Sequence, residues 1–330
     1  MNFKNFKSKL YVLLILLTLI SIPSKVLAYS SKVYLGGENI GIEVNSKGVL
    51  IVGFYDVKNT SPGKDAGLKI GDIITKVDDT AIYSITDLSD VISSNQNLKI
   101  TYLRNNKTYS TTIKIIKEGN TYKTGLYVKD KIVGIGTLSF IDPQSKIFGA
   151  LGHEVIEKTT NYKFEIEDGK IFKSTVSSIH KSERNDPGEK NAKYYVDTVY
   201  GTIEKNEKTG IFGKYNASLN NKKLIEVASK EEITVGNATI YTVIDNDKVE
   251  EFSINILKVY PNDKTKNILF EITDEKLLSR TNGVVQGMSG SPIVQNNKLI
   301  GAVNYVIVDN PQKGYGIFIT NMLEETDKIG

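Results

Sequence analysis

Apolar residues in this chain are grouped into short runs, and three regions differ in how those runs are spaced. Residues 10–22 form one mainly apolar run. Residues 36–118 mix short strand-like stretches with segments of helical spacing, and from residue 124 onward long stretches rich in Val, Ile, Thr and Tyr are separated by Gly, Asn and Asp. This pattern predicts a mainly β chain with two folded domains behind a targeting segment.

The N-terminal apolar run has the features of a secretory signal peptide. Three lysines precede residues 10–22, and small residues occupy the −3 and −1 positions of a cleavage site after Ala28. The run has 13 residues, whereas a membrane span needs roughly 20. We therefore expect export across a bacterial plasma membrane, with residues 1–28 either removed as a signal peptide or kept as a membrane anchor.

Residues 36–118 are predicted to form one small domain. The expected elements are a helical turn at 64–66, a strand at 73–77, a helix that Ser84 or Thr86 caps and that ends at 92, and a hairpin of 97–103 with 108–116. The phrase SPGKDAGLKIGDIITKVDDTAI within it resembles the PDZ domains of bacterial proteases.

That resemblance implies a peptide-binding groove. In PDZ domains a peptide adds as an extra strand, here beside residues 49–54, and Val49, Ile51 and Gly53 would line the groove. The alternative is that these apolar residues form an ordinary inner strand.

Residues 124–330, after a linker at 119–123, are predicted to form a second domain that is almost wholly β. Their length is enough for two β-barrels. The expected strands are 132–141, 170–178, 193–200, 232–244, 252–259, 293–295 and 299–303, with one short helix near 274–278.

Composition excludes several kinds of chemistry. The chain has no cysteine and only two histidines, so disulfides, thiolate nucleophiles and histidine-rich metal centres are not expected. A net charge of +4, from 42 basic and 38 acidic residues, gives no reason to expect a nucleic-acid partner. Any catalysis is expected to proceed without metal or cofactor.

One candidate nucleophile lies in Gly287-Met288-Ser289-Gly290-Ser291-Pro292. This stretch fits the Gly-x-Ser-Gly-x-Pro pattern of chymotrypsin-like serine proteases, in which a glycine-rich turn exposes a hydroxyl. Ser289 is the expected nucleophile and Ser291 its rival. The N–H groups of Gly287 and Ser289 are the expected oxyanion donors. The alternative is a polar β-turn without chemistry.

His153 is the candidate general base. It follows a strand and the turn Gly149-Ala150-Leu151-Gly152, and the pKa of histidine near neutrality suits proton transfer. His180 has no comparable setting and is interpreted as structural.

A carboxylate that orients the imidazole is harder to choose. Asp274 lies 15 residues before Ser289, but an aspartate at that position could equally cap the short helix that follows. Asp168 and Asp197 are the other candidates.

Three longer segments of the sequence indicate a particular family of serine peptidases. GLYVKDKIVGIGTLSFIDPQSKIFGALGHEV (residues 125–155), DPGEK (186–190) and the stretch from 272 to 319 resemble the stage IV sporulation protein B peptidases of endospore-forming bacteria. The resemblance implies a chymotrypsin-like double β-barrel behind a PDZ domain, and a catalytic set of His153, Ser289 and Asp274.

The same resemblance implies a role in signalling. Such peptidases act in the space between forespore and mother cell, where they cleave a regulatory membrane protein so that a late sigma factor matures. They also cleave themselves near the N-terminus, and their PDZ domain helps recognition. Two other functions stay open: a catalytically inactive PDZ and β-barrel module that only binds peptides, and a general quality-control PDZ protease.

Overall fold

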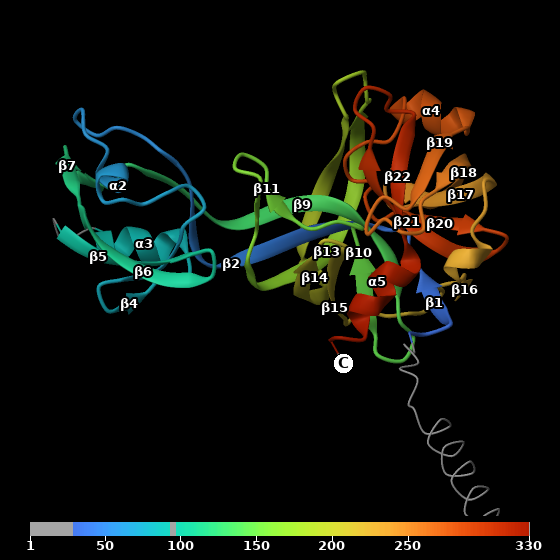
Figure 1. The fold of residues 1–330 in the computed structure, drawn as a ribbon, viewed down its shortest axis with the longest axis horizontal. Coiled ribbons are helices and arrows are strands. Elements are labelled where there is room, and N and C mark those ends of the chain that lie inside the picture. The colour runs from blue at the N-terminus through green and yellow to red at the C-terminus, as the bar shows by residue number, and fades with distance from the viewer. Residues whose placement is uncertain (1–28, 93–96, 330) are drawn as a thin grey trace, which may run out of the picture.

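Two lobes joined by two long strands make up the molecule (Figure 1). The computed structural model describes residues 29–92 and 97–329. The export segment predicted at residues 1–28 lies outside the described residues. Within the described ranges, none of the helices combines the length and apolar character that crossing a membrane requires.

The smaller lobe confirms the element types predicted for its sequence. Its own elements are α2 (Pro62–Asp65), β3 (Ile73–Val77), β4 (Thr80–Ala81), α3 (Ile85–Ile92), β5 (Asn97–Arg104) and β6 (Lys107–Lys114). Asn105 and Asn106, with φ of 51° and 60°, make the tight turn between β5 and β6, and asparagine tolerates this left-handed conformation. The predicted linker at 119–123 forms the turn and second strand of a small hairpin of β7 (Ile116–Glu118) and β8 (Thr121–Lys123).

Strands β2 (Asn39–Phe54) and β9 (Leu126–Ile141) belong to both lobes (Figure 1). In the smaller lobe Leu50 pairs with Lys129 of β9, and Leu126 packs in the apolar core of that lobe. The first half of β2 pairs instead with strands of the larger lobe. Strand β2 therefore continues from one lobe into the other.

This arrangement bears on the predicted peptide groove. Leu50 is paired on both sides, with Ile73 of β3 and with Lys129 of β9, and Val49 and Ile51 are fully buried. A peptide could add beside these residues only after β9 was displaced. The predicted groove at Val49, Ile51 and Gly53 is therefore occupied by the chain itself, and burial agrees with the alternative of an inner strand.

The larger lobe contains two closed rings of six strands. The first ring runs β2, β9, β10, β15, β14, β13 and back to β2. Its further strands are β10 (Ile147–Ala150), β13 (Ile166–His180), β14 (Glu189–Glu207) and β15 (Gly210–Tyr215), with the two-residue pair β11 (Ile156–Glu157) and β12 (Tyr162–Lys163) beside it.

The second ring runs β17, β18, β19, β22, β21, β20 and back to β17. Its strands are β17 (Gly236–Val243), β18 (Val249–Val259), β19 (Ile268–Ile272), β20 (Pro292–Gln295), β21 (Lys298–Val306) and β22 (Lys313–Phe318). Each ring encloses its own cluster of buried apolar side chains. The predicted chymotrypsin-like double barrel is confirmed.

A third apolar cluster joins the barrels. It includes residues of β1 (Lys32–Leu35), β16 (Leu224–Val227) and α5 (Ile319–Thr326). Helix α5 was not predicted, although Ile319, Met322 and Leu323 follow helical spacing and are fully buried. The other helical segments of this lobe are α4 (Glu275–Thr281), which was predicted, and the 3-10 turn η1 (Lys230–Glu232).

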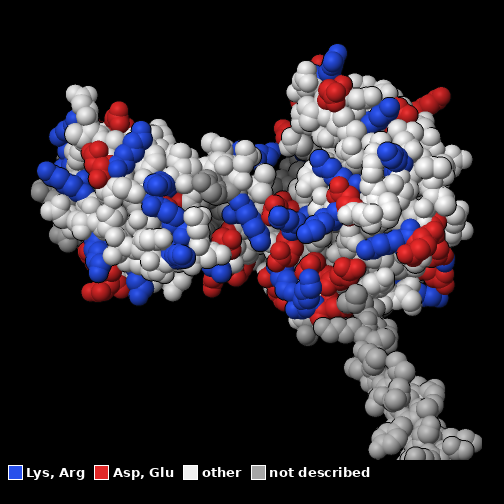
Figure 2. All heavy atoms as spheres, in the orientation of Figure 1, with Lys and Arg blue, Asp and Glu red and all other residues white. Residues whose placement is uncertain are grey.

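Charged side chains of both signs are interspersed over the face of the molecule that Figure 2 shows. A surface that binds nucleic acid presents one continuous basic patch. The visible face has no such patch, in keeping with the small net charge of +4.

The shared strand β9 gives a prediction about stability. Leu126→Ala removes a side chain from the core of the smaller lobe although Leu126 lies beyond residue 118. We expect the free energy of unfolding of that lobe to fall by about 2–4 kcal/mol, measured by urea denaturation. The neighbouring Tyr127 is 57% exposed, so Tyr127→Ala should cost about 1 kcal/mol or less; equal losses would contradict the shared core.

Candidate active site

The serine-bearing turn lies between α4 and β20, where the two barrels meet. Gly287 and Gly290 both have φ of +94°, a conformation that favours glycine. A Cβ on Gly290 would lie 2.0 Å from the carbonyl oxygen of Thr137, so this position also has no room for a side chain. The turn leaves Ser289 partly exposed.

Strand β9 of the first barrel holds this turn through three hydrogen bonds. The Thr137 hydroxyl donates to the Gly287 carbonyl at 2.8 Å, and the Thr137 N–H donates to the Ser289 carbonyl at 2.9 Å. The Ser139 hydroxyl donates to the Gly290 carbonyl at 2.8 Å. All three carbonyls are therefore directed toward β9. The sequence pattern did not indicate Thr137 and Ser139 as residues of the site, because both look like ordinary strand residues.

The N–H groups of the turn divide into paired and unpaired ones. Those of Met288, Gly290 and Ser291 donate to backbone carbonyls at 3.0, 2.7 and 2.9 Å. Within the described chain, the N–H groups of Gly287 and Ser289 have no backbone acceptor. Unpaired backbone donors in a buried turn are uncommon. These two are the predicted oxyanion donors, and they are the ones that remain free to bind a developing negative charge.

A strained turn delivers His153 at the end of β10. The N–H of Gly152 donates to the Ala150 carbonyl at 2.9 Å, which makes Leu151 the centre of a γ-turn with φ of 70°. This form of γ-turn is rare and strained for a residue with a side chain. Leu151 is only 4% exposed, so core packing keeps it in this conformation.

The surroundings of His153 suit a general base. Its Nδ1 lies 2.9 Å from the Glu154 carbonyl oxygen; because a carbonyl only accepts, Nδ1 carries the proton and Nε2 keeps its lone pair. The ring stacks on Tyr305 with centroids 5.7 Å apart. Burial lowers the pKa of His153 below its ordinary value, while the carbonyl and carboxylate of Glu154 act in the opposite direction. The neutral imidazole is therefore favoured.

His153 and Ser289 converge on adjacent residues of β21. The Ser289 hydroxyl donates to the Asn304 carbonyl at 3.4 Å, and the His153 ring covers Tyr305. Gly152 packs against Asn304 so closely that a Cβ on the glycine would lie 3.1 Å from the Cβ of Asn304. Among the described residues, no hydrogen bond joins the side chains of His153 and Ser289. Because a 3.4 Å contact is weak, the hydroxyl is easily released toward another acceptor. Their catalytic pairing stays a prediction.

Asp274 lies elsewhere. Its carboxylate accepts from the N–H of Leu277 at 2.9 Å, so it caps α4, and it also accepts from the N–H of Ser253 at 3.4 Å. Glu154 is the one carboxylate whose charge acts on the pKa of His153. Among the described residues, neither a hydrogen bond nor a charge effect links Asp274 to His153, and the Glu154 carbonyl lies beside Nδ1 instead.

The remaining sequence candidates are also away from the imidazole. Asp168 accepts from Asn45 at 2.5 Å, and Asp197 is exposed on β14. The Nε2 atom of His180 lies 3.5 Å from the Asp186 carboxylate, and the side chain is largely exposed. Ser291 is fully buried, with its hydroxyl 3.5 Å from that of Thr137, so the rival nucleophile is inaccessible.

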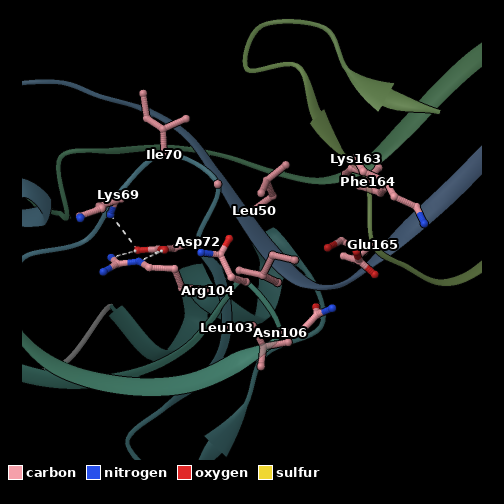
Figure 3. A pocket seen from close by; sticks show the side chains of 14 residues that line it. Leu50, Lys69, Ile70, Asp72, Leu103, Arg104, Asn106, Lys163, Phe164 and Glu165 are labelled. Carbon is pink, nitrogen blue, oxygen red and sulfur yellow. Dashed lines mark hydrogen bonds and ion pairs between the residues drawn. The ribbon is translucent and has the colours of Figure 1, made fainter. Parts of the chain in front are cut away.

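A cavity of about 330 Å³ lies between the two lobes rather than at Ser289. Figure 3 shows Lys163, Phe164 and Glu165 of the larger lobe on one side of it and residues of the smaller lobe on the other. Arg104, at its edge, is bound to the buried Asp72 at 2.6 and 2.7 Å. This guanidinium is therefore already paired, and the cavity has no contact with the residues predicted to be catalytic.

A family model described as SpoIVB peptidase S55 matches residues 120–323. The chain belongs to this family. A PDZ domain model matches residues 38–115. The chain is therefore a serine peptidase with a PDZ domain, and the predicted residues His153, Asp274 and Ser289 all lie within the matched range.

Other comparisons give more limited likenesses. Two proteins named serine protease Do-like HtrA, from Lactococcus lactis strains IL1403 and MG1363, are each 41% identical over 73 residues, which is 21% of this chain and 18% of theirs. The PDZ domain of an SdrC-like protein from Listeria monocytogenes is 30% identical, with a TM-score of 0.22, over 26% of this chain and 90% of that one. The Rv3671c protease of M. tuberculosis, in its active form, is 14% identical over 60% of this chain and 75% of that one, with a TM-score of 0.35.

The role of Asp274 can be tested with two substitutions. Asparagine caps a helix as well as aspartate, whereas alanine does not and should cost about 1 kcal/mol of stability. If Asp274 only caps α4, Asp274→Asn should keep the kcat of the wild type. A fall on the order of 10⁴-fold in that variant would instead show that this carboxylate orients the base.

The lowered pKa of His153 predicts the pH dependence of catalysis. Because the base must be neutral, kcat/KM should rise with pH to a plateau. The midpoint of this rise should lie below 6.5, the ordinary pKa of histidine. The Glu154 carboxylate raises this pKa, so Glu154→Gln should move the midpoint further toward acid. A midpoint unchanged in that variant, measured across pH 4–8 with a peptide substrate, would contradict the assigned environment.

Proposed function

We propose that this serine peptidase acts outside the plasma membrane as a signalling endopeptidase of sporulation. In this role it cleaves a regulatory membrane protein, and itself near its N-terminus, and so starts the activation of a late sigma factor. The observation that carries the proposal is the match of the SpoIVB peptidase model to residues 120–323. The export segment predicted at residues 1–28 is the second support.

The proposed reaction uses Ser289 as nucleophile, His153 as general base and acid, and the serine-bearing turn as the source of oxyanion donors. The Ser289 hydroxyl attacks a peptide carbonyl as His153 Nε2 takes its proton, and the N–H groups of Gly287 and Ser289 bind the oxyanion. The imidazolium then gives the proton to the leaving amine, and water repeats the sequence to release the acyl group. The Glu154 carbonyl holds Nδ1 throughout.

The smaller lobe offers one strand edge for recognition of a peptide. Residues 126–131 of β9 pair with β2 on one side, and in the described chain no strand pairs with their other side. Helix α3 lies beside them, where Asp130 accepts from the N–H of Ile85 at 2.8 Å. Since PDZ domains add a peptide between a strand and a helix, this edge is where we propose that a substrate segment binds.

The position of β1 is consistent with action close to a membrane. This strand directly follows the predicted export segment and pairs with β9 and β16 of the larger lobe. If residues 1–28 stay as an anchor, the peptidase lobe rather than the PDZ lobe is tethered nearest the membrane.

A single comparison of wild type, Ser289→Ala and Ser291→Ala tests the function. Wild type and Ser291→Ala should shorten at the N-terminus and react with a fluorophosphonate probe, whereas Ser289→Ala should lose at least about 10³-fold in rate. Intact mass and mapping of the labelled peptide measure both effects, and circular dichroism checks folding.

Comparison of two kinds of substrate distinguishes a signalling peptidase from a quality-control protease and from a module that only binds peptides. Casein and a membrane-protein ectodomain should be incubated side by side with the same three proteins. Rapid cleavage of casein would indicate a quality-control protease, and inertness of wild type toward every substrate and the probe would indicate a module that only binds peptides. Cleavage limited to the chain itself and few ectodomain sites would support a signalling peptidase.

A further inference from the structure

A buried lysine next to the serine-bearing turn has no part in the chemistry described above. Lys190 is the second residue of β14, in the DPGEK segment, and is only 2% exposed. Burial lowers its pKa to about 7, and no neighbouring carboxylate counters this effect. An amine without a carboxylate partner is costly to bury.

The amine of Lys190 connects the two barrels. Its Nζ donates to the Thr242 hydroxyl at 2.9 Å and approaches the Asn39 amide oxygen at 3.5 Å. Thr242 belongs to β17 of the second barrel and Asn39 to β2 of the first, and both are buried. The Asn39 side chain is in turn fixed by a hydrogen bond to Ser174 at 2.9 Å.

The stem of Lys190 packs against Gly287. A Cβ on Gly287 would lie 3.1 Å from Cδ, 3.2 Å from Cβ and 3.3 Å from Cγ of Lys190. The main chain is joined as well, because the Lys190 N–H donates to the Gln286 carbonyl at 2.9 Å. Lys190 therefore contacts the residue whose N–H is one of the two unpaired donors.

The contacts of the amine exclude a direct role in proton transfer in this geometry. Nζ is hydrogen-bonded to Thr242 and approaches Asn39, and it has no hydrogen bond with Ser289 or His153 among the described residues. Its influence on the reaction must pass through the peptide of Gly287. A purely apolar stem would fill the same space without the cost of burying an amine, so the amine needs a separate explanation.

We propose that Lys190 is a positioning residue of the peptidase centre: its amine fixes the stem between the barrels, and the stem holds the Gly287 peptide with its N–H directed toward the oxyanion. This inference rests on the proposed peptidase activity. Because the donors act only when charge develops on the carbonyl oxygen, loss of the amine should reduce kcat and leave KM nearly unchanged.

Lys190→Met tests the amine, since methionine keeps an unbranched stem. We expect kcat to fall about 10- to 100-fold, with KM within about twofold. A peptide boronate, which mimics the tetrahedral intermediate, should bind more weakly by a similar factor. Thr242→Val removes the acceptor and should change kcat in the same direction, and the double variant should lose little more than Lys190→Met alone.

Lys158→Met is the matched control. Lys158 is exposed and donates to the side chain of Gln286 at 2.9 Å. Its substitution therefore removes a lysine that is bound next to the serine-bearing turn and leaves the contacts of Gly287 unchanged. Its kcat and boronate affinity should equal those of the wild type. Thermal unfolding of each variant separates loss of fold from loss of rate.

The outcomes separate this inference from the function it rests on. Wild-type kcat in both Lys190→Met and Thr242→Val, or a raised KM with unchanged kcat, would overturn the positioning role while leaving the peptidase intact. Equal inertness of wild type and Ser289→Ala would overturn both. A loss of kcat and boronate affinity in folded Lys190→Met, absent from Lys158→Met, supports the proposal.

Discussion

The hydrogen bonds from β9 to the serine-bearing turn are the constraint on which the candidate site depends. Thr137 and Ser139 take up the carbonyls of Gly287, Ser289 and Gly290. Each of these carbonyls shares a planar peptide unit with the N–H of the next residue, so the three bonds also fix the directions of the N–H groups of Met288, Gly290 and Ser291. The first barrel thus holds the backbone on both sides of Ser289 in a turn that belongs to the second barrel.

The junction of the two barrels contains several energetically unfavourable features that a purely structural turn would not need. Leu151 is held in a strained γ-turn, two backbone N–H groups lack backbone acceptors, and Lys190 is buried without a carboxylate partner. Strain and unpaired polar groups of this kind persist where the surrounding structure over-determines them, and they cluster at functional sites. These features gather around the turn that bears Ser289, whose catalytic role stays a prediction.

The smaller lobe is built into the peptidase rather than attached to it by a linker. Strands β2 and β9 pass through both lobes, so the PDZ sheet contains a strand that continues directly to Thr137. A change of pairing at Leu126–Lys129 would act on the same strand that holds the serine-bearing turn. Through this continuity the smaller lobe is joined to the candidate site by a single hydrogen-bonded strand.

Local sequence determined much of this protein. The turn residues Gly287 and Gly290, the histidine after a glycine turn, most strands, α4 and the PDZ elements all follow from short-range patterns, because backbone conformation and hydrophobic periodicity are local properties. The choice of Ser289 over Ser291 also agrees with the structure, which buries the second hydroxyl.

Only the tertiary structure decided which distant groups meet. A carboxylate spaced correctly from Ser289 proved to cap α4, while the Glu154 carbonyl took the place beside His153. The pairing of Leu50 with Lys129 filled the expected peptide groove. Lys190, Thr137 and Tyr305 lie in segments that resemble the family, but the sequence did not assign them to the site. Such outcomes depend on how two barrels and a shared strand dock, and side chains brought together by long-range packing leave no periodic trace along the chain.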